Sequence, residues 1–134
     1  MLQPGAGGRS HRLRGQRLRF SGACRGLGAR MVVKRIYLAG PMSGLPEFNY
    51  PAFHAAAALL RAQGHHVENP AENPQPACGT WRGYMRMSLR QIADCDCLCM
   101  LSGWRSSRGA RIEHGLALDL GLEVCDFAEV AHAQ

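Results

Sequence analysis

Along residues 31–134, short apolar runs alternate with longer segments in which apolar residues recur at helical spacing. Arg35 to Ala39 is such a run, with β-branched, aromatic and aliphatic residues, and Gly40-Pro41 follows it directly. This pattern predicts a strand that ends in a turn. Three further short runs predict strands at His65 to Glu68, Asp96 to Leu101 and Leu122 to Phe127.

The segment after the first strand has the features of an amphipathic helix. Asn49 is placed to cap it, and Gly64 is placed to end it. The residues with helical spacing, which we expect on the buried face, are Phe53, Ala57 and Leu60.

Two more helices are predicted between the later strands. Thr80 is placed to cap the first of them, and its apolar face carries Trp81, Met85, Ser88 and Ile92. We therefore expect Ser88 to point inward. The other helix is predicted to start near Ser107 and to run to Leu120, where Gly121 ends it.

The order of these elements, with strands and helices alternating, predicts an α/β fold with right-handed crossovers. We expect a flavodoxin- or Rossmann-like three-layer sandwich with a four- to five-stranded, mainly parallel sheet. Ligands of such sheets bind at the carboxyl ends of the strands. The loops at those ends span residues 40–48, 69–79 and 102–107, and the proline-rich second loop has the length of a lid or substrate-facing segment.

Charge divides the chain into two parts. Residues 1–30 hold seven Arg and no Asp or Glu, whereas residues 31–134 hold nine Lys or Arg against ten acids, a formal charge of −1. We expect residues 1–30 to be a disordered Arg- and Gly-rich extension, with Met31 as the natural start, and residues 31–134 to form one domain. The alternative is a nucleic-acid-binding arm. No run approaches the length of a membrane span.

The six cysteines do not have the spacing of a metal site or of a disulfide framework, since no Cys-x-x-Cys pair occurs. Cys95, Cys97 and Cys99 alternate along a predicted strand, so we expect their side chains to share one face of the sheet as small buried hydrophobes. We expect no bound metal or cofactor. Reduced thiols are typical of a cytoplasmic protein.

Glu113 lies in the middle of the apolar face of the last helix. The residues within about 60° of it around the helix axis are Gly109, Ala110, Leu116, Ala117 and Leu120. A carboxylate on a packing face is costly unless it is paired or faces a cleft, and such placement is typical of catalytic acids. The structural alternative is a Glu that pairs with an Arg or binds a backbone amide.

Two loops have groups that suit an anion. Ser106 or Ser107 is placed to cap the last helix, and Arg108 and Gly109 follow in its first turn, where free amides attract phosphates. The turn after the first strand, Gly40-Pro41-Met42-Ser43-Gly44, offers further amides, although it matches neither the dinucleotide fingerprint nor a Walker loop. An ordinary capped helix with a solvated Arg is the alternative.

Taken together, these motifs resemble the nucleoside 2-deoxyribosyltransferase superfamily, which includes the deoxynucleoside 5′-monophosphate N-glycosidases. The resemblance spans Lys34 to about Val124 and is greatest for an uncharacterised bacterial and phage branch. Its motifs are Ile-Tyr-Leu-Ala-Gly-Pro from Ile36, Asp-Cys-Asp from Asp94, Asn-Pro-Ala-Glu from Asn69, and Gly-Trp-x-x-Ser-Arg-Gly-Ala from Gly103.

The resemblance implies roles for individual residues. Glu113 would be the nucleophile that attacks the anomeric carbon, and Tyr37 would hydrogen-bond it. Ser107 would contact the 5′ end of the sugar. The residues expected to contact substrate are Gly40, Pro41, Met42, Ser43, Ser88, Asp96, Trp104, Ser107, Arg108 and Gly109.

One position departs from the family pattern, because Ser88 stands where the family commonly has an Asp. Three hypotheses therefore remain. The first is an enzyme that cleaves or transfers the N-glycosidic bond of a deoxynucleoside or its monophosphate. The second is a nucleotide-binding or sensing module without turnover, and the third is a nucleic-acid binder that uses the Arg-rich segment. The expected partners are a small nucleoside or nucleotide and further copies of the chain, with no membrane and no nucleic acid.

Overall fold

Strand β1 (Arg35–Ala39) lies inside a sheet of four parallel strands in the order β2-β1-β3-β4. Its neighbours are β2 (His66–Glu68) and β3 (Cys97–Met100), and β4 (Glu123–Asp126) pairs with the far side of β3. This is the strand order of flavodoxin-like folds, so the predicted fold class is confirmed. The computed structural model describes residues 32–132. Predictions for residues 1–30 and for Cys24 lie outside that range.

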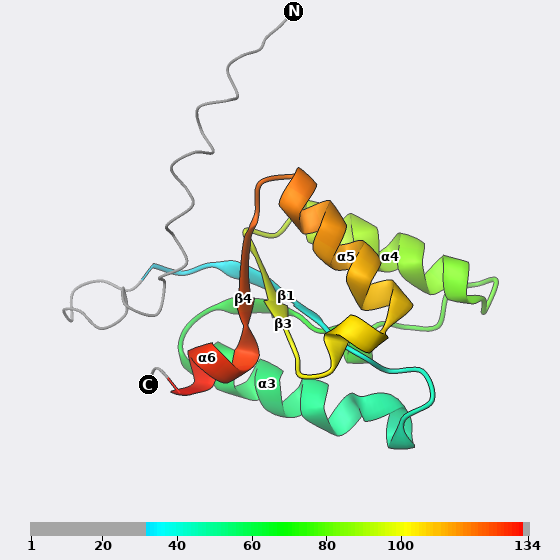
Figure 1. The fold of residues 1–134 in the computed structure, drawn as a ribbon, viewed down its shortest axis with the longest axis horizontal. Helices are drawn as coiled ribbons and strands as arrows, with labels where there is room; N and C mark the ends of the chain where they lie inside the picture. The colour runs from blue at the N-terminus through cyan, green and yellow to red at the C-terminus, as the bar shows by residue number, and fades with distance from the viewer. Residues whose placement is uncertain (1–31, 133–134) are drawn as a thin grey trace, which may run out of the picture.

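Helices cover both faces of the sheet (Figure 1). On one face, α3 (Tyr50–Ala62) and α6 (Phe127–His132) pack on an apolar cluster that includes Ile36, Leu38 and Phe53. On the other face, α4 (Trp81–Ala93) and α5 (Arg108–Asp119) pack on a cluster that includes Tyr37 and Leu98. Alternate residues of each strand therefore point to opposite layers. Within the described part of the chain, no helix is long and apolar enough to cross a bilayer.

Two of the three predicted helix caps are confirmed. The hydroxyl of Thr80 accepts a hydrogen bond from the Gly83 amide at 3.1 Å, and the hydroxyl of Ser107 accepts one from the Ala110 amide at 3.1 Å. Such caps satisfy an amide that the first turn of a helix leaves without a partner. Both helices therefore start at defined positions at the carboxyl edge of the sheet.

Asn49 occupies the predicted N-cap position of α3, but its side chain does not cap the helix. Asn49 ends a short 3-10 segment, η3 (Pro46–Asn49), and its side chain makes no capping bond. Its Nδ2 atom donates to the Pro41 carbonyl at 3.0 Å. Glu47, Phe48 and Asn49 all have positive φ angles, of 53°, 53° and 60°. The chain thus enters α3 through a left-handed turn that is costly for residues with a Cβ atom.

Three further placements differ from the prediction. Cys95 packs in the cluster under α4 and α5, opposite Cys97 and Cys99, because it precedes β3 and does not follow the strand alternation. Phe127, which was predicted to end the last strand, begins α6, a helix that the sequence pattern did not predict. Leu120 is exposed, because α5 ends at Asp119 and Leu120 is only its C-cap.

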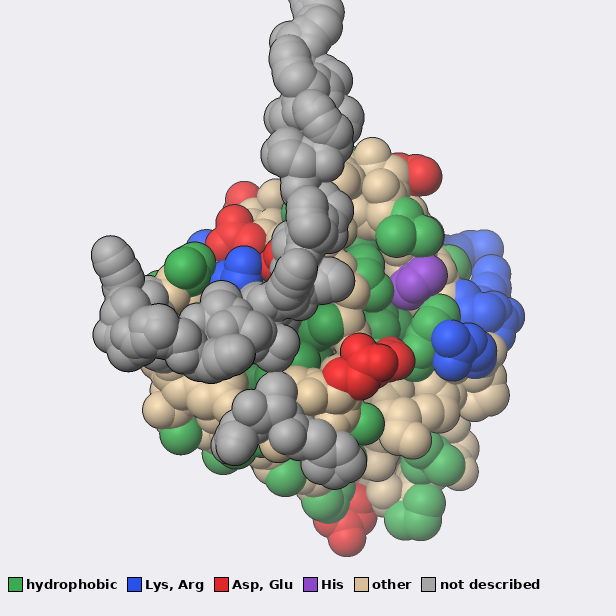
Figure 2. All heavy atoms as spheres, turned by 60° about the vertical axis from the view of Figure 1, so that its left-hand side comes forward, with side chains coloured by type: hydrophobic (Ala, Val, Ile, Leu, Met, Phe, Trp, Pro, Cys, Tyr) green, Lys and Arg blue, Asp and Glu red, His purple; other side chains and the backbone are tan. Residues whose placement is uncertain are grey.

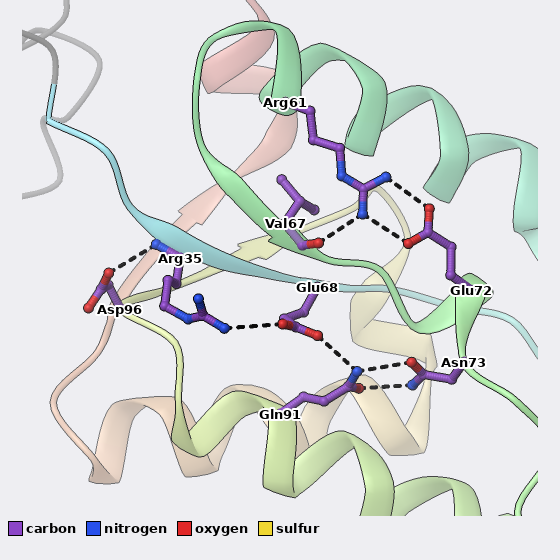
Figure 3. Close-up of polar contacts among 8 residues, drawn as sticks. All are labelled: Arg35, Arg61, Val67, Glu68, Glu72, Asn73, Gln91 and Asp96. Carbon is purple, nitrogen blue, oxygen red and sulfur yellow. Dashed lines mark hydrogen bonds and ion pairs between the residues drawn. The ribbon is translucent and has the colours of Figure 1, made fainter.

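Polar contacts anchor the loop that follows β2 (Figure 3). In η4 (Pro70–Glu72), the Glu72 carboxylate accepts two hydrogen bonds from Arg61 of α3, both at 2.9 Å. Next to it, the side-chain amides of Asn73 and Gln91 exchange hydrogen bonds of 2.8 and 2.9 Å, and Gln91 also donates to Glu68 at 3.0 Å. The loop is therefore tied both to α3 and to α4.

Two glycines provide a matched test of the packing between β1 and β3. A methyl group at Gly40 would lie 2.8 Å from the Cβ atom of Leu101, whereas one at Gly115 of α5 would meet nothing within 4 Å. We expect Gly40→Ala to lower the free energy of unfolding by about 1–3 kcal/mol through overpacking. We expect Gly115→Ala to raise it by about 0.5–1 kcal/mol through helix propensity. Urea denaturation of both variants measures the two effects, and equal shifts would contradict the close approach.

Candidate functional site

A pocket of about 760 Å³ opens at the carboxyl edge of the sheet. Its walls come from the loops after β1, β2 and β3 and from the first turns of α4 and α5. Parallel strands place the loops that follow them at one edge, which is why segments far apart in the sequence meet here. The predicted location of the ligand site therefore coincides with a real cavity.

Glu113 and Tyr37 meet at the wall of this pocket. The Tyr37 hydroxyl donates a hydrogen bond of 3.1 Å to Oε2 of Glu113, and Tyr37 is 0% and Glu113 7% exposed. Tyr37 comes from the middle of β1, and Glu113 comes from the buried face of α5 between Ala110 and Ala117. The small alanine side chains let α5 lie close to the sheet, so the carboxylate reaches the phenol.

Burial determines the protonation of this pair. It raises the pKa of Glu113 to about 7, although hydrogen bonds from Tyr37 and Ser88 act in the opposite direction. The pKa of Tyr37 is also raised well above its usual value, first by burial and then by the charge of Glu113. The phenol is therefore a neutral donor at physiological pH. The carboxylate can gain or lose its proton near neutrality, as a catalytic acid or base does.

The first turn of α5 forms the rim of the pocket. Ser107, Arg108 and Gly109 all line the cavity, and the guanidinium carbon of Arg108 lies 4.4 Å from the centre of the Trp81 ring of α4. This cation–π contact holds a positive charge beside the pocket. At Gly109 the space of a side chain is taken by Met85, whose sulfur lies 3.1 Å from where a Cβ atom would be. Gly109 thus lets α4 and α5 approach closely.

The structure brings together ten of the twelve residues predicted for the site. Besides Glu113 and Tyr37, the residues that line the pocket are Gly40, Pro41, Met42, Ser43, Ser88, Ser107, Arg108 and Gly109. Ser88 is buried and points inward, as its place on α4 predicts. Asp96 and Trp104 are not among the lining residues.

The prediction that Asp96 binds substrate does not agree with its position. Asp96 directly precedes β3, and its Oδ2 atom accepts a hydrogen bond from the backbone amide of Arg35 at 2.9 Å (Figure 3). It therefore lies at the amino edge of the sheet, at the opposite end from the pocket. There its carboxylate fixes the start of β1 against β3.

Trp104 lies beside the pocket rather than in its wall. Its ring stacks on His114 of α5 at 4.4 Å between centroids, and the guanidinium carbon of Arg105 lies 4.7 Å from the ring centre. Because both faces of an indole are available for such contacts, the ring serves to pack η5 (Trp104–Ser106) on α5. The ring does not line the pocket.

Sequence reasoning missed the aromatic wall of the cavity. The aromatic lining residues that were not predicted for the site are Phe48, Tyr50, Phe53, Trp81 and Tyr84. The signal was present as a cluster of aromatic residues on either side of Asn49. The pattern there predicts only the start of a helix, because nothing in it indicates the left-handed turn at Phe48.

The lining holds one acid, Glu113, and one cation, Arg108. Within residues 32–132, no group of three or more His, Cys, Asp or Glu side chains lies close enough together to hold a metal ion. The pocket thus places a carboxylate on its wall, a guanidinium at its rim and aromatic surface between them. A ligand with an anionic end and a flat ring matches these groups.

The family described as "Domain of unknown function (DUF4406)" matches residues 34–126 of the chain. These residues include all four strands and every residue that lines the pocket. No curated protein matches the chain.

The raised pKa of Glu113 predicts a dependence of stability on pH. Between its ordinary value of 4.5 and about 7, Glu113 holds a proton in the folded chain but not in the unfolded one. The free energy of unfolding therefore falls as pH rises through this window, by on the order of 3 kcal/mol from this group. Glu113→Gln, which cannot ionise, should gain stability relative to the parent as pH rises from 5 to 8.

Urea denaturation at several pH values measures this difference. Asp119→Asn, an exposed acid on the same helix, is the matched control and should show no such trend between pH 5 and 8. A constant difference between the parent and Glu113→Gln across this range would show that the carboxylate is not desolvated.

Proposed function

The chain belongs to the DUF4406 family, a domain of unknown function, and from the pocket itself we propose that it acts on the N-glycosidic bond of a nucleoside or nucleotide. The expected substrate is a deoxynucleoside or its 5′-monophosphate, and the reaction is hydrolysis or transfer to another base. The resemblance of its motifs to the nucleoside 2-deoxyribosyltransferase superfamily supports this proposal. The observation that carries it is the buried Glu113 carboxylate, held by Tyr37 at the wall of a pocket.

The chemistry needs an oriented carboxylate with an available oxygen. Tyr37 donates to Oε2 of Glu113, and Glu113 lines the pocket, so its carboxylate is oriented at the wall where an anomeric carbon would approach. Since Tyr37 is completely buried in the sheet, its hydroxyl fixes the carboxylate with little loss of entropy during the reaction. Ionised Glu113 would then be the nucleophile.

The reaction has two balanced steps. A Glu113 oxygen forms a bond to the anomeric carbon while the carbon–nitrogen bond breaks, and the base leaves with the electron pair and takes up a proton. Water then bonds to the anomeric carbon and releases a proton, while the Glu113–carbon bond breaks and its electron pair returns to the carboxylate. The products are free base and deoxyribose phosphate.

The remaining groups of the pocket suit the rest of a nucleotide. Arg108 is held over Trp81 at the rim, and the hydroxyl hydrogen of Ser107 is free to donate because only its oxygen is used in the helix cap. These groups would bind a 5′-phosphate. The aromatic side chains of Phe48 and Tyr84 also line the cavity and offer surface to the base.

A second candidate is a nucleotide-binding module without turnover. The specific observation in its favour is that Glu113 is the single acid of the pocket wall, with Ser88 on α4 where a second carboxylate would lie. A hydroxyl does not act as a general acid at neutral pH, and glycosidases commonly use two carboxyl groups. Such a module would bind nucleotides and release no base.

Base release from deoxynucleoside monophosphates separates these functions. We expect the chain to liberate free base, detected by chromatography, and we expect Glu113→Gln to reduce the rate at least about 10³-fold because it removes the nucleophile. Asp119→Asn, on the same helix and exposed, should keep the parent rate. Saturable nucleotide binding without base release would select the binding module, and full activity of Glu113→Gln would exclude Glu113 as nucleophile.

The pH profile of base release tests the protonation of the nucleophile. Because the pKa of Glu113 is raised to about 7 and only its ionised form attacks, kcat/KM should rise about tenfold per pH unit below pH 7 and level off above it. Initial rates at low substrate concentration between pH 5 and 9 measure this profile. A rate that is constant across pH 7 would contradict the assigned role.

A further inference from the structure

Charges on the surface of the domain are segregated. The three ion pairs among residues 32–132 use Lys34, Arg35 and Arg61. The described cations that form no ion pair are Arg82, Arg86, Arg90, Arg105, Arg108 and Arg111. All six come from α4, η5 and α5, and all six are exposed. In Figure 2, Lys and Arg side chains gather mainly at one edge of the visible face, away from most Asp and Glu side chains.

Acidic residues are almost absent from these elements. Helix α4 contains no Asp or Glu, and α5 contains only the buried Glu113 and Asp119 at its last position. The formal charge of −1 for residues 31–134 therefore conceals a strongly positive surface. Arginines with no acids beside them repel one another, so these side chains do not stabilise the helices that carry them.

Five of the six arginines come from η5 and from the first two turns of α4 and α5, at the end of these helices where the pocket opens, and we call these five the arginine arc. Among them, Arg108 lines the pocket. The arc consists of Arg82, Arg86, Arg105, Arg108 and Arg111. Arg82 follows Trp81, on which Arg108 stacks at 4.4 Å, and Arg86 lies one helical turn further along α4. On the other side, Nη1 of Arg111 donates to the Arg105 carbonyl at 3.0 Å. The arc thus extends over the first two turns of α4 and α5, which pack against each other.

Exposed aromatic side chains line the pocket together with Arg108. Phe48, Trp81 and Tyr84 all line the pocket and are all exposed, with 59%, 39% and 40% of their surface accessible. Exposed aromatic rings next to a basic groove are the combination by which proteins bind single-stranded nucleic acids, because bases stack on the rings while cations follow the phosphates. A free mononucleotide has one phosphate group and would use only a small part of the arc.

We propose that the arginine arc binds the phosphate backbone of a single-stranded nucleic acid whose exposed nucleotide enters the pocket. This inference rests on the proposed function for the fate of that nucleotide, but not for binding itself. It changes the substrate class from a free nucleotide to a nucleotide within or at the end of a strand. It also gives the exposed parts of Phe48, Trp81 and Tyr84 a second role, which is to stack on bases beside the one in the pocket.

An acidic peptide is the competing partner for a basic surface. The exposed rings favour a nucleic acid, because flat bases stack on aromatic side chains and carboxylate side chains do not. The spacing of the arginines is also suitable. Arg82 and Arg86 are about 6 Å apart along the axis of α4, which is comparable to the distance between successive phosphates of a nucleic-acid strand.

Fluorescence anisotropy with a labelled single-stranded deoxyoligonucleotide of about 10 nucleotides tests the proposal. The full chain should bind it saturably, with an affinity that falls steeply between about 50 and 200 mM salt. We expect Arg82→Gln/Arg86→Gln to weaken binding roughly fivefold to tenfold at the lower salt and to reduce the log–log salt slope by about 1.4, or 0.7 for each phosphate contact. Tyr84→Ala should weaken binding roughly tenfold.

Arg35→Gln is the matched control, since it removes one exposed arginine at the opposite end of β1, and it should keep the parent affinity. Every variant retains residues 1–30, so differences among them report on the arc. Equal binding by all variants, equal losses for Arg35→Gln and Arg86→Gln, or equally tight binding of a poly-glutamate peptide would overturn the proposal.

Strand binding and base release, both measured on the parent chain, separate this proposal from the proposed function. Base release from free monophosphates combined with no binding of the strand would overturn the arc proposal alone. Binding of the strand without base release from any nucleotide would overturn only the glycosidic activity.

Discussion

The burial of one carboxylate against one phenol is the constraint on which the site depends. Glu113 is taken out of water by the sheet and by α5, and its hydrogen bond to Tyr37 compensates only part of the cost of desolvation. A glutamine of the same shape would be less costly at neutral pH. Glu113 therefore lowers the free energy of unfolding at neutral pH, which is common for ionisable groups in active sites.

The neighbouring features keep this costly group in place. Ser107 defines where α5 begins, Ala110 and Ala117 allow the helix to lie close to β1, and Gly109 allows α4 to lie close to α5. A change in any of them would move Glu113 relative to the Tyr37 hydroxyl. The position of Glu113 relative to Tyr37 is therefore determined mainly by how closely the helices and β1 pack. Residues with short side chains set this packing, and such side chains have few alternative conformations.

Much of the fold and part of the site could be predicted from the sequence. Hydrophobic periodicity located the strands and placed Ser88 and Glu113 on buried faces, because burial imposes the period that the pattern records. Asp96 and Trp104 could not be placed in this way. Both are polar or amphipathic residues just outside a strand, where hydrophobic periodicity does not predict which way a side chain points. The net charge also did not indicate the basic surface, because a sum of −1 does not reveal that all the charged residues of α4 are arginines.

The left-handed turn at Glu47, Phe48 and Asn49 has a consequence for how the pocket fits its ligand. Each residue in this conformation lies on the order of 1–2 kcal/mol above the right-handed form. Two walls of the pocket are formed by the starts of α4 and α5, whose backbone is capped and unstrained. The third wall is the left-handed turn, and a rearrangement there would lower its backbone strain energy. Adaptation to ligands of different size should therefore be concentrated around Phe48, while the wall that holds the carboxylate stays fixed.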